Sequence, residues 1–577
     1  MIVRTARFVG KVTFAGALLS EIRQFLFFCA FFCLSVSLLA EDNASLLNPQ
    51  NSGSNSPVSN IQDEDDSNVT FQVQTFRFKG LKAFPAKVLT STLQAFRQVP
   101  LQFDDLSRIV THLGEFYKKE GKIVSVKIPP QDITDGILII DLAEARVGKI
   151  IIDPGGSSHV KHSRIKATVE SYSPAKKIYD ASSMNRGLLL ADDLPGVSMT
   201  GFLQAGEEDG EVDLVLKTSK EPPYIADLVV DNAHSRSLGT YRATLAASLV
   251  SPFQLAETIG LQTLKSEGSI YGRLSLGMPF GSRGWRVNLY GSSLSYDVVT
   301  DELAALNIKG EVEEAGLSLR YPIIRNQRGN LYQNYQFDHR IYLSSVASIT
   351  QKHYSIDSLS MNLSGNLFDT IWGGGANSMS IGLSQGKVSG LDGIPTNPHE
   401  GYHTLINYSA SRQQTISEKL SFFLSVSGQL THDVSTNSLH TIEATADNVT
   451  EDFLDSAESF SLGGLNGVRA YPSGEATGSV GRLVKAELRY ILSNDIITKT
   501  FYDWGWVGER DPTTTGPSEY ELSGCGVNFA WSAPLGFSMQ ATYARRFGEN
   551  PNPSPTGMDQ DGSLEEDRFW VVLGRSF

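Results

Sequence analysis

Cysteine is scarce in this chain of 577 residues, which contains only three. Two of them, Cys29 and Cys33, lie in a hydrophobic stretch near the N-terminus that we interpret as a leader. Once a leader is removed, Cys525 is the only thiol left, which excludes an intramolecular disulfide. Exported proteins need not contain disulfides, so this scarcity does not decide the redox compartment.

Positive charge is in deficit as well. The chain has 49 lysine and arginine residues against 63 aspartate and glutamate residues, a formal net charge of -14. The basic side chains do not gather into a patch. Binding to phosphate backbones depends on such clusters, so the composition argues against a nucleic-acid partner.

Motifs of catalysis and metal binding are missing from the sequence. There is no P-loop, no Gly-x-Ser-x-Gly elbow and no His-Glu-x-x-His. His159 and His162 lie one helical turn apart, but without further ligands nearby they are typical of a solvated helix face. The acidic run at residues 63–66 is typical of a linker. We therefore expect no enzymatic activity, no cofactor and no metal.

Long hydrophobic runs are limited to one. Basic residues precede an apolar stretch at residues 25–39, which ends at Ala40. This pattern predicts a signal peptide at residues 1–40, with a single membrane-anchoring helix as the alternative. No later run approaches the ~20 residues that a spanning helix needs, so any further crossing must use strands. Residues 41–70, rich in Asn, Ser and Asp, are expected to be a disordered linker without a clear plug helix.

Two stretches of mixed periodicity follow, at residues 71–145 and 146–222. Each predicts the order strand, helix, helix, strand, strand. In the first, apolar residues recur at i, i+3, i+4 and i+7 from Leu106 to Tyr117, the pattern of an amphipathic helix. Such α+β units leave a strand edge free, which can pair either with an extended peptide or with a neighbouring unit.

Alternation with a period of two dominates residues 223–577. We count about sixteen candidate strands of roughly ten residues, with apolar residues on one side and small polar residues on the other, as in a membrane barrel. A soluble sandwich is the alternative. The outward band should include Val287, Leu289, Met361 and Leu424, and the lumen should receive Asn288 and Asn362. The fold class predicted is an all-β membrane barrel of about 16 antiparallel strands behind two α+β domains.

A long interruption of the strand pattern, residues 433–482, carries a glycine-rich segment. Gly463, Gly464 and Gly467 permit a tight hairpin. We expect Arg469 to form an ion pair with Asp503, which lies on a short aromatic strand; an ordinary surface loop is the alternative. The candidate site residues are Gly464, Val468, Arg469, Ala470 and Tyr471 in the loop, and Phe501, Asp503 and Gly505 on the strand.

These two segments resemble the V-R-G-Y and F-x-D-x-G motifs of the outer-membrane transporters of two-partner secretion, the haemolysin secretion and activation class (ShlB, FhaC and HecB). Here the loop motif is V-R-A-Y, because Ala470 replaces a glycine. The resemblance implies that the loop folds back into a barrel lumen, where its arginine pairs with the aspartate of the wall. The substitution concerns the turn at Ala470 and leaves the charged pair available.

Three further segments support the resemblance. Residues 128–140 resemble the first, and residues 185–197 the second, POTRA domain of the same transporters. The last strand, residues 569–577, alternates and ends on Phe577, which resembles the signal read by the barrel-assembly machinery during biogenesis. The implied location is the bacterial outer membrane, with the POTRA domains in the periplasm.

The implied function is export of an unfolded haemolysin- or haemagglutinin-like polypeptide. The POTRA domains would recognise this passenger and the barrel would pass it outward without ATP. The expected partners are the secreted polypeptide, outer-membrane lipid and the assembly machinery, with no nucleic acid. Two alternatives remain open: an insertase of the same superfamily that folds other barrels, and a passive porin or surface protein.

Overall fold

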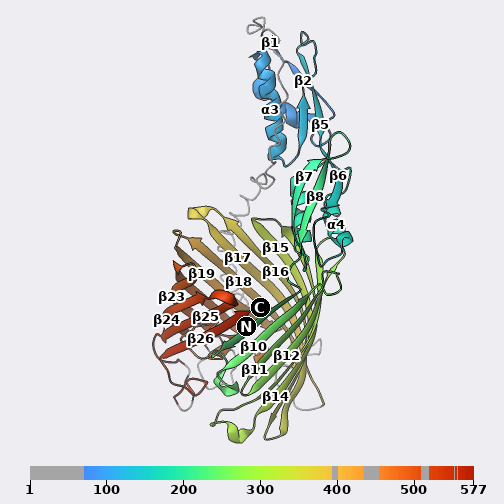
Figure 1. Cartoon of the computed structure of the whole chain (residues 1–577). Coiled ribbons are helices and arrows are strands. Elements are labelled where there is room, and N and C mark those ends of the chain that lie inside the picture. The colour runs from blue at the N-terminus through green and yellow to red at the C-terminus, as the bar shows by residue number, and fades with distance from the viewer. Residues whose placement is uncertain (1–69, 393–399, 434–453, 509–518, 552, 555–556) are drawn as a thin grey trace, which may run out of the picture.

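The computed structural model describes residues 70–392, 400–433, 454–508, 519–551, 553–554 and 557–577. The predicted signal peptide, almost all of the predicted linker and residues 434–453 of the long loop lie outside these ranges. No helix in the described ranges is long and apolar enough to cross a membrane. The molecule consists of two α+β units that form an arm at one end of a barrel (Figure 1).

The first unit follows the predicted element order. Its sheet has the order β2-β5-β4, with β2 parallel to β5 and β4 antiparallel to it. The side chain of Asp105 accepts a hydrogen bond from the Gln102 backbone N–H at 2.9 Å, which caps the longer helix. Leu89, Ile109 and Leu138 are among its fully buried core residues. The elements are β1 (Phe71–Gln72), β2 (Thr75–Lys79), α2 (Ala86–Thr92), η2 (Gln94–Phe96), β3 (Pro100–Leu101), α3 (Phe103–Lys119), β4 (Val124–Lys127) and β5 (Ile137–Glu144).

The second unit repeats this arrangement. Its sheet has the order β6-β8-β7, again with one parallel and one antiparallel pair. Two helices bury Ile165, Met184 and Leu214 in a separate core. The elements are β6 (Arg146–Ile152), α4 (His162–Glu170), α5 (Ala181–Asp192), β7 (Ser198–Ala205) and β8 (Glu211–Ser219).

An ion pair joins the two units. Lys122 Nζ lies 3.0 Å from a carboxylate oxygen of Asp180, and the Ala181 N–H donates to the Gly121 carbonyl at 2.8 Å. Burial by itself raises the pKa of Asp180. The backbone N–H of Ser183 and the ammonium of Lys122 outweigh it and lower this pKa to about 2.

We predict that Asp180→Asn destabilises the two-unit arm at neutral pH by about 1 to 2 kcal/mol, because asparagine still caps α5 but loses the charge that pairs with Lys122. A carboxyl whose folded pKa lies below its ordinary value of 3.8 stabilises above that value, and this stability is lost as the pH falls toward about 2. Urea unfolding of residues 70–222 should therefore show a difference at pH 7 that disappears near pH 2. Glu207→Gln, in the exposed pair with Lys149, is the matched control and should change little.

Sixteen strands close into one antiparallel barrel, which confirms the predicted fold class. The first strand, β9, pairs with both β10 and the last strand, β26. The strands are β9 (Tyr224–Asp231), β10 (Arg242–Val250), β11 (Thr258–Ser266), β12 (Ser269–Phe280), β13 (Trp285–Asp297), β14 (Lys309–Arg325), β15 (Gly329–Val346), β16 (Ile349–Asp369), β17 (Gly375–Gly390), β18 (Gly401–Thr415), β19 (Leu420–Asp433), β22 (Val480–Ser493), β23 (Ile496–Gly508), β24 (Glu519–Ser532), β25 (Phe537–Arg546) and β26 (Asp567–Ser576). Short 3-10 turns between them are η3 (Arg236–Leu238), η4 (Ala304–Leu306), η5 (Ile371–Gly373) and η7 (Pro534–Gly536).

Several strands are longer than the expected ten residues. The longest, β16, has 21 residues. About ten residues suffice to cross a bilayer, but backbone pairing also stabilises a hairpin in water, so the ladders continue past the membrane. The ring is least paired between β26 and β9, which match only over residues 572–576 of β26, whereas β15 pairs with β16 along its whole length.

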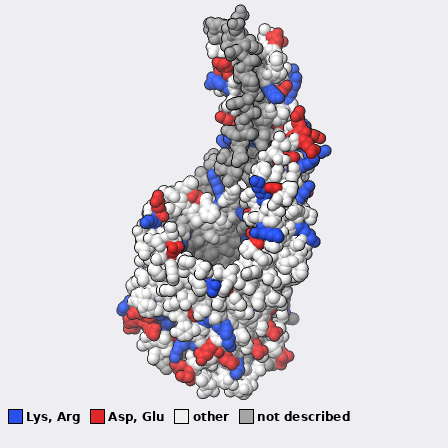
Figure 2. Space-filling model, viewed as in Figure 1, with Lys and Arg blue, Asp and Glu red and all other residues white. Residues whose placement is uncertain are grey.

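The strands alternate between an outer apolar face and a polar lumen. Leu289 and Met361 are 48% and 44% exposed on the outside. Asn362, on the lumen side, accepts a hydrogen bond from the Ser380 hydroxyl at 2.8 Å. Figure 2 shows few charged side chains across the middle of the barrel and many at the end away from the arm. This distribution is typical of a barrel with a lipid-facing band.

The second unit is seated directly on the near rim of the barrel. Arg325, at the end of β14, forms a bidentate ion pair with Asp193 at 2.8 Å. Arg186 on α5 donates to the carbonyls of Pro322 and Ile323, and the Ser171 hydroxyl donates to the Ser282 carbonyl at 3.0 Å. Segment 185–197, singled out in the sequence, therefore supplies contacts that hold the arm to the barrel.

Candidate functional site in the barrel lumen

The described part of the long loop, residues 454–479, packs inside the barrel. It contains η6 (Ser456–Glu458) and two paired strands, β20 (Phe460–Ser461) and β21 (Thr477–Gly478). Its apolar side chains are buried against the inner face of β22 to β25. This shared core comprises Leu462, Val468, Ala470, Tyr471 and Ala476 from the loop, and Leu483, Phe501, Val507, Tyr520, Leu522 and Ala544 from the wall.

Two glycines shape the turn before Arg469. Gly464 has a φ of +104°, in the region that side chains disfavour. At Gly467, a Cβ atom would lie 1.7 Å from the carbonyl oxygen of Leu462. This close approach lets the Val468 N–H donate to the same carbonyl at 2.7 Å. The turn thereby fixes where the arginine side chain begins.

The structure brings Arg469 and Asp503 together. Nε and Nη2 of the guanidinium donate to the two carboxylate oxygens at 2.8 and 2.7 Å. The backbone N–H of Arg469 donates to the same carboxylate at 3.1 Å. The two side chains are only 8% and 0% exposed. A bidentate, charge-assisted pair of this kind is among the strongest polar contacts in proteins, and we call it the Arg469 anchor.

Phe501, Asp503 and Gly505 share the lumen face of β23, because side chains two residues apart on a strand point the same way. The guanidinium carbon of Arg469 lies 3.4 Å from the centroid of the Phe501 ring. A Cβ atom on Gly505 would lie 2.5 Å from Cδ2 of Leu462 in the loop. The F-x-D-x-G spacing therefore provides an aromatic surface, a carboxylate and space for the loop.

Ala470, the departure from the V-R-G-Y motif, is accommodated by the wall. Its φ is not positive, so the backbone does not require glycine there. A Cβ atom on Gly524 of β24 would lie 2.5 Å from the methyl group of Ala470. The glycine on the wall thus leaves room for the methyl group beside Arg469.

Two contacts of Arg469 could not be predicted from the sequence motifs. Its Nη1 donates to Glu487 of β22 at 2.9 Å, and its carbonyl accepts from the indole N–H of Trp570 at 2.7 Å. Glu487 also pairs with Arg489 at 2.8 Å. The alternation of Lys485, Glu487 and Arg489 on one strand was a usable signal for charges that face the lumen. No local pattern singles out Trp570.

The η6 turn forms a second attachment, which we call the η6 anchor. Arg340 on β15 forms an ion pair with Glu458, and their side chains are 19% and 11% exposed. The hydroxyl of Tyr354 on β16 donates to Asp455 at 3.0 Å. The Gln429 amide donates to the Glu458 carbonyl at 2.8 Å. The loop is therefore held to two separated parts of the wall.

The returning limb of the loop contacts the last hairpin. The buried carboxylate of Glu475 accepts from the Asn550 side chain at 2.7 Å and from the Gln560 backbone N–H at 2.8 Å. The Ser473 hydroxyl donates to the Ala233 carbonyl at 2.9 Å. Across the described ranges, no group of three His, Cys, Asp or Glu residues is arranged to hold a metal ion.

We predict that Gly505→Val displaces the loop from the wall. The added side chain would meet Leu462 and Val468, and overpacking of this kind costs about 1 to 3 kcal/mol. The barrel itself should assemble normally, because strand pairing is retained. Single-channel conductance in planar bilayers should increase. Gly272→Val on β12 is the matched control, since a Cβ atom there meets nothing within 4 Å; equal conductance in both variants would contradict the prediction.

The chain is similar to known proteins over most of its length. Residues 210–530, more than half of the chain, match the family model described as haemolysin secretion/activation protein ShlB/FhaC/HecB. The chain belongs to this family. Residues 71–145 match the ShlB-type POTRA domain. As a member of a family of outer-membrane translocators, the chain places its barrel in the outer membrane and its POTRA units in the periplasm.

Individual relatives cover most of the chain. The Heme/hemopexin transporter protein HuxB of Haemophilus influenzae strain 86-028NP is 22% identical over 501 residues, 83% of this chain and 82% of the relative. CdiB from Escherichia coli has a TM-score of 0.70 at 16% identity and covers 94% of this chain, which covers 95% of CdiB. CdiB from Acinetobacter baumannii has a TM-score of 0.64 at 17% identity, with coverage of 97% and 98%. The chain therefore shares its overall fold with these two CdiB structures.

Proposed function

We propose that this chain exports an unfolded polypeptide across the outer membrane, and that its long loop controls the passage. The observation that carries the proposal is the loop buried in the lumen and attached by two separate anchors. A loop so placed must move before an extended chain can pass. The passenger proposed is a haemolysin- or haemagglutinin-like polypeptide, and the family description supports the haemolysin class.

The POTRA units are proposed to receive the passenger in the periplasm. Within the described residues, each three-stranded sheet ends in edge strands, β2 and β4 in one unit and β6 and β7 in the other. An extended polypeptide can add to such an edge through backbone hydrogen bonds. Phe202 on β7 is 41% exposed and lies beneath the ammonium of Lys217, so this edge also offers an apolar contact.

The energy for export is proposed to come from folding of the passenger outside the cell. The sequence has no phosphate-binding loop for ATP. The test is to reconstitute the purified chain in liposomes and to add urea-unfolded passenger from the POTRA side without nucleotide. We expect the passenger to become resistant to external protease. Failure of protection without nucleotide, together with protection when ATP is added, would contradict this mechanism.

We predict that deletion of residues 71–222 abolishes export while the barrel still assembles. Strand closure holds the barrel together, so the heat-modifiable form should persist in the outer membrane. Passenger in the medium is measured by immunoblot from cells that express both chains. Unchanged export after the deletion would favour the passive-pore alternative.

A further inference from the structure

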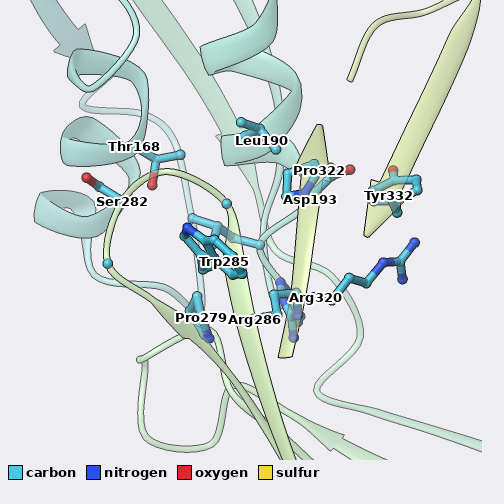
Figure 3. A pocket seen from close by; sticks show the side chains of 14 residues that line it. Thr168, Leu190, Asp193, Pro279, Ser282, Trp285, Arg286, Arg320, Pro322 and Tyr332 are labelled. Atoms are coloured by element: carbon cyan, nitrogen blue, oxygen red, sulfur yellow. The ribbon is translucent and has the colours of Figure 1, made fainter. Parts of the chain in front are cut away.

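A partly open pocket lies where the second POTRA unit meets the barrel rim. It has a volume of about 300 Å³, and Figure 3 shows the side chains that line it. One side is formed by Leu190 on α5 and by Asp193 at the C-terminal end of this helix. The other side is formed by the barrel residues Trp285, Arg286 and Arg320. The space is therefore bounded by both parts of the molecule at the periplasmic mouth.

Two arginines lie side by side in this space. Arg286 on β13 and Arg320 on β14 are directly opposite each other in the strand register. They share the lumen face with Tyr290 and Asn288, because Leu289 points outward. A Cβ atom on Gly277, on the same inner face, would lie 4.0 Å from Nη2 of Arg286. Both side chains therefore lie on the lumen face of the wall and not on its lipid face.

Like charges placed opposite each other on neighbouring strands are destabilising. Other lumen arginines have acidic partners: Arg273 pairs with Glu314 at 3.3 Å and Arg489 with Glu487 at 2.8 Å. Asp193, the carboxylate that lines the space, is already held by Arg325 in a bidentate pair. Within the described part of the chain, neither Arg286 nor Arg320 forms an ion pair. The space thus carries two arginines without an ion pair of their own, beside an aspartate that is already held by Arg325.

The surroundings suit an anion. The guanidinium carbon of Arg320 lies 3.9 Å from the centroid of the Tyr332 ring, which supports one face of the guanidinium and leaves its N–H groups free to donate. Trp285 stacks on Tyr321 at 4.5 Å between centroids, and Leu190 closes the space from α5. These apolar side chains line one side of the space, while Arg320 itself is exposed.

We infer that Arg286 and Arg320 bind the carboxylate of an acidic side chain of the passenger as it enters the barrel from the periplasm. Two adjacent guanidinium groups match the geometry of a carboxylate. A polypeptide is the favoured source, since the pair faces the lumen through which the passenger would pass. This inference rests on the proposed export function and adds to it a preference for acidic residues in the passenger.

The test is equilibrium binding to the full-length protein in lipid nanodiscs. Two fluorescein-labelled peptides of equal length are compared, one alternating glycine with glutamate and the other glycine with glutamine. We expect the glutamate peptide to bind more tightly, and Arg286→Gln with Arg320→Gln to weaken it by about tenfold or more, because two charge-assisted hydrogen bonds are lost. Arg273→Gln, a lumen arginine with its own acidic partner, is the matched control and should bind as the wild type does.

The lysine pair Arg286→Lys with Arg320→Lys keeps the charge and should retain most of the binding, which separates loss of charge from misfolding. Equal binding of both peptides, or equal binding by the glutamine variant and the wild type, would overturn the inference. So would displacement of the peptide by inorganic phosphate but not by acetate. The assay involves no transport, so a protein that binds the glutamate peptide yet fails to export would count against the proposed function and not against this site.

Discussion

Arg469→Ala is expected to lower export of the passenger by about tenfold or more while normal amounts of heat-modifiable barrel reach the outer membrane. The substitution leaves the buried carboxylates of Asp503 and Glu487 without the guanidinium between them, and loss of one partner of a buried pair costs about 3 to 5 kcal/mol. This cost weakens docking of the loop and not the barrel, because closed strand pairing holds the barrel together independently. Export is measured by immunoblot of the medium, and loop position by single-channel conductance.

Asp503→Ala should also lower export of the passenger, but by less than Arg469→Ala, because Glu487 remains to neutralise the arginine. A charge swap between positions 469 and 503 is expected to fail. The carboxylate introduced at position 469 would face Glu487, which repels it. Arg412→Ala is the matched control, since its pair with Asp369 is also buried but lies on the outer side of the wall, where Arg412 is opposite Leu424, and does not contact the loop. Wild-type export in both Arg469→Ala and Asp503→Ala would remove the loop from the mechanism.

Arg340→Ala is expected to release the first limb of the loop and to raise channel conductance strongly. The substitution strands Glu458 in a site that is 11% exposed, again at a cost of about 3 to 5 kcal/mol. Tyr354→Phe removes only the hydrogen bond to Asp455. It should weaken docking of the loop by about 1 to 3 kcal/mol and therefore raise conductance less than Arg340→Ala does. Conductance is compared with that of Arg412→Ala in the same bilayers.

The two anchors act on one loop, so their effects should depend on each other. Once Arg469→Ala has freed the tip, the further change caused by Arg340→Ala should be smaller than in the wild-type background. A double-mutant cycle on conductance measures this coupling. Strict additivity would show that the limbs move independently, which is contrary to a single docked unit.

The barrel could be predicted from the sequence because its signal is local. Alternation of residues such as Leu289 and Asn288 repeats within each strand, and each strand shows it separately. The helices of the POTRA units are predictable for the same reason, as with the apolar face from Leu106 to Tyr117. Arg469 and Asp503 were found as a pair because two short motifs resemble those of a known family.

Contacts that depend on strand register across the ring could not be predicted. Arg340 and Glu458 lie far apart in the sequence, and nothing local marks them as partners. Trp570 reaches Arg469 only because β26 curves back beside β9 when the ring closes. The contact of the second POTRA unit with the rim likewise depends on segments that only the finished barrel brings together, such as the turn at Ser282 and the end of β14 at Pro322.

The unequal pairing around the ring has a consequence for the order in which the protein folds. The seam between β9 and β26 joins segments 339 residues apart in the chain, so its closure has the largest loop entropy to overcome. It also offers the fewest backbone hydrogen bonds in return, although the Asn232 side chain adds two across the seam, to Phe569 and Val571. Amide protons along this line should be the first in the barrel to exchange with solvent, and β26 the last strand to find its neighbour during assembly.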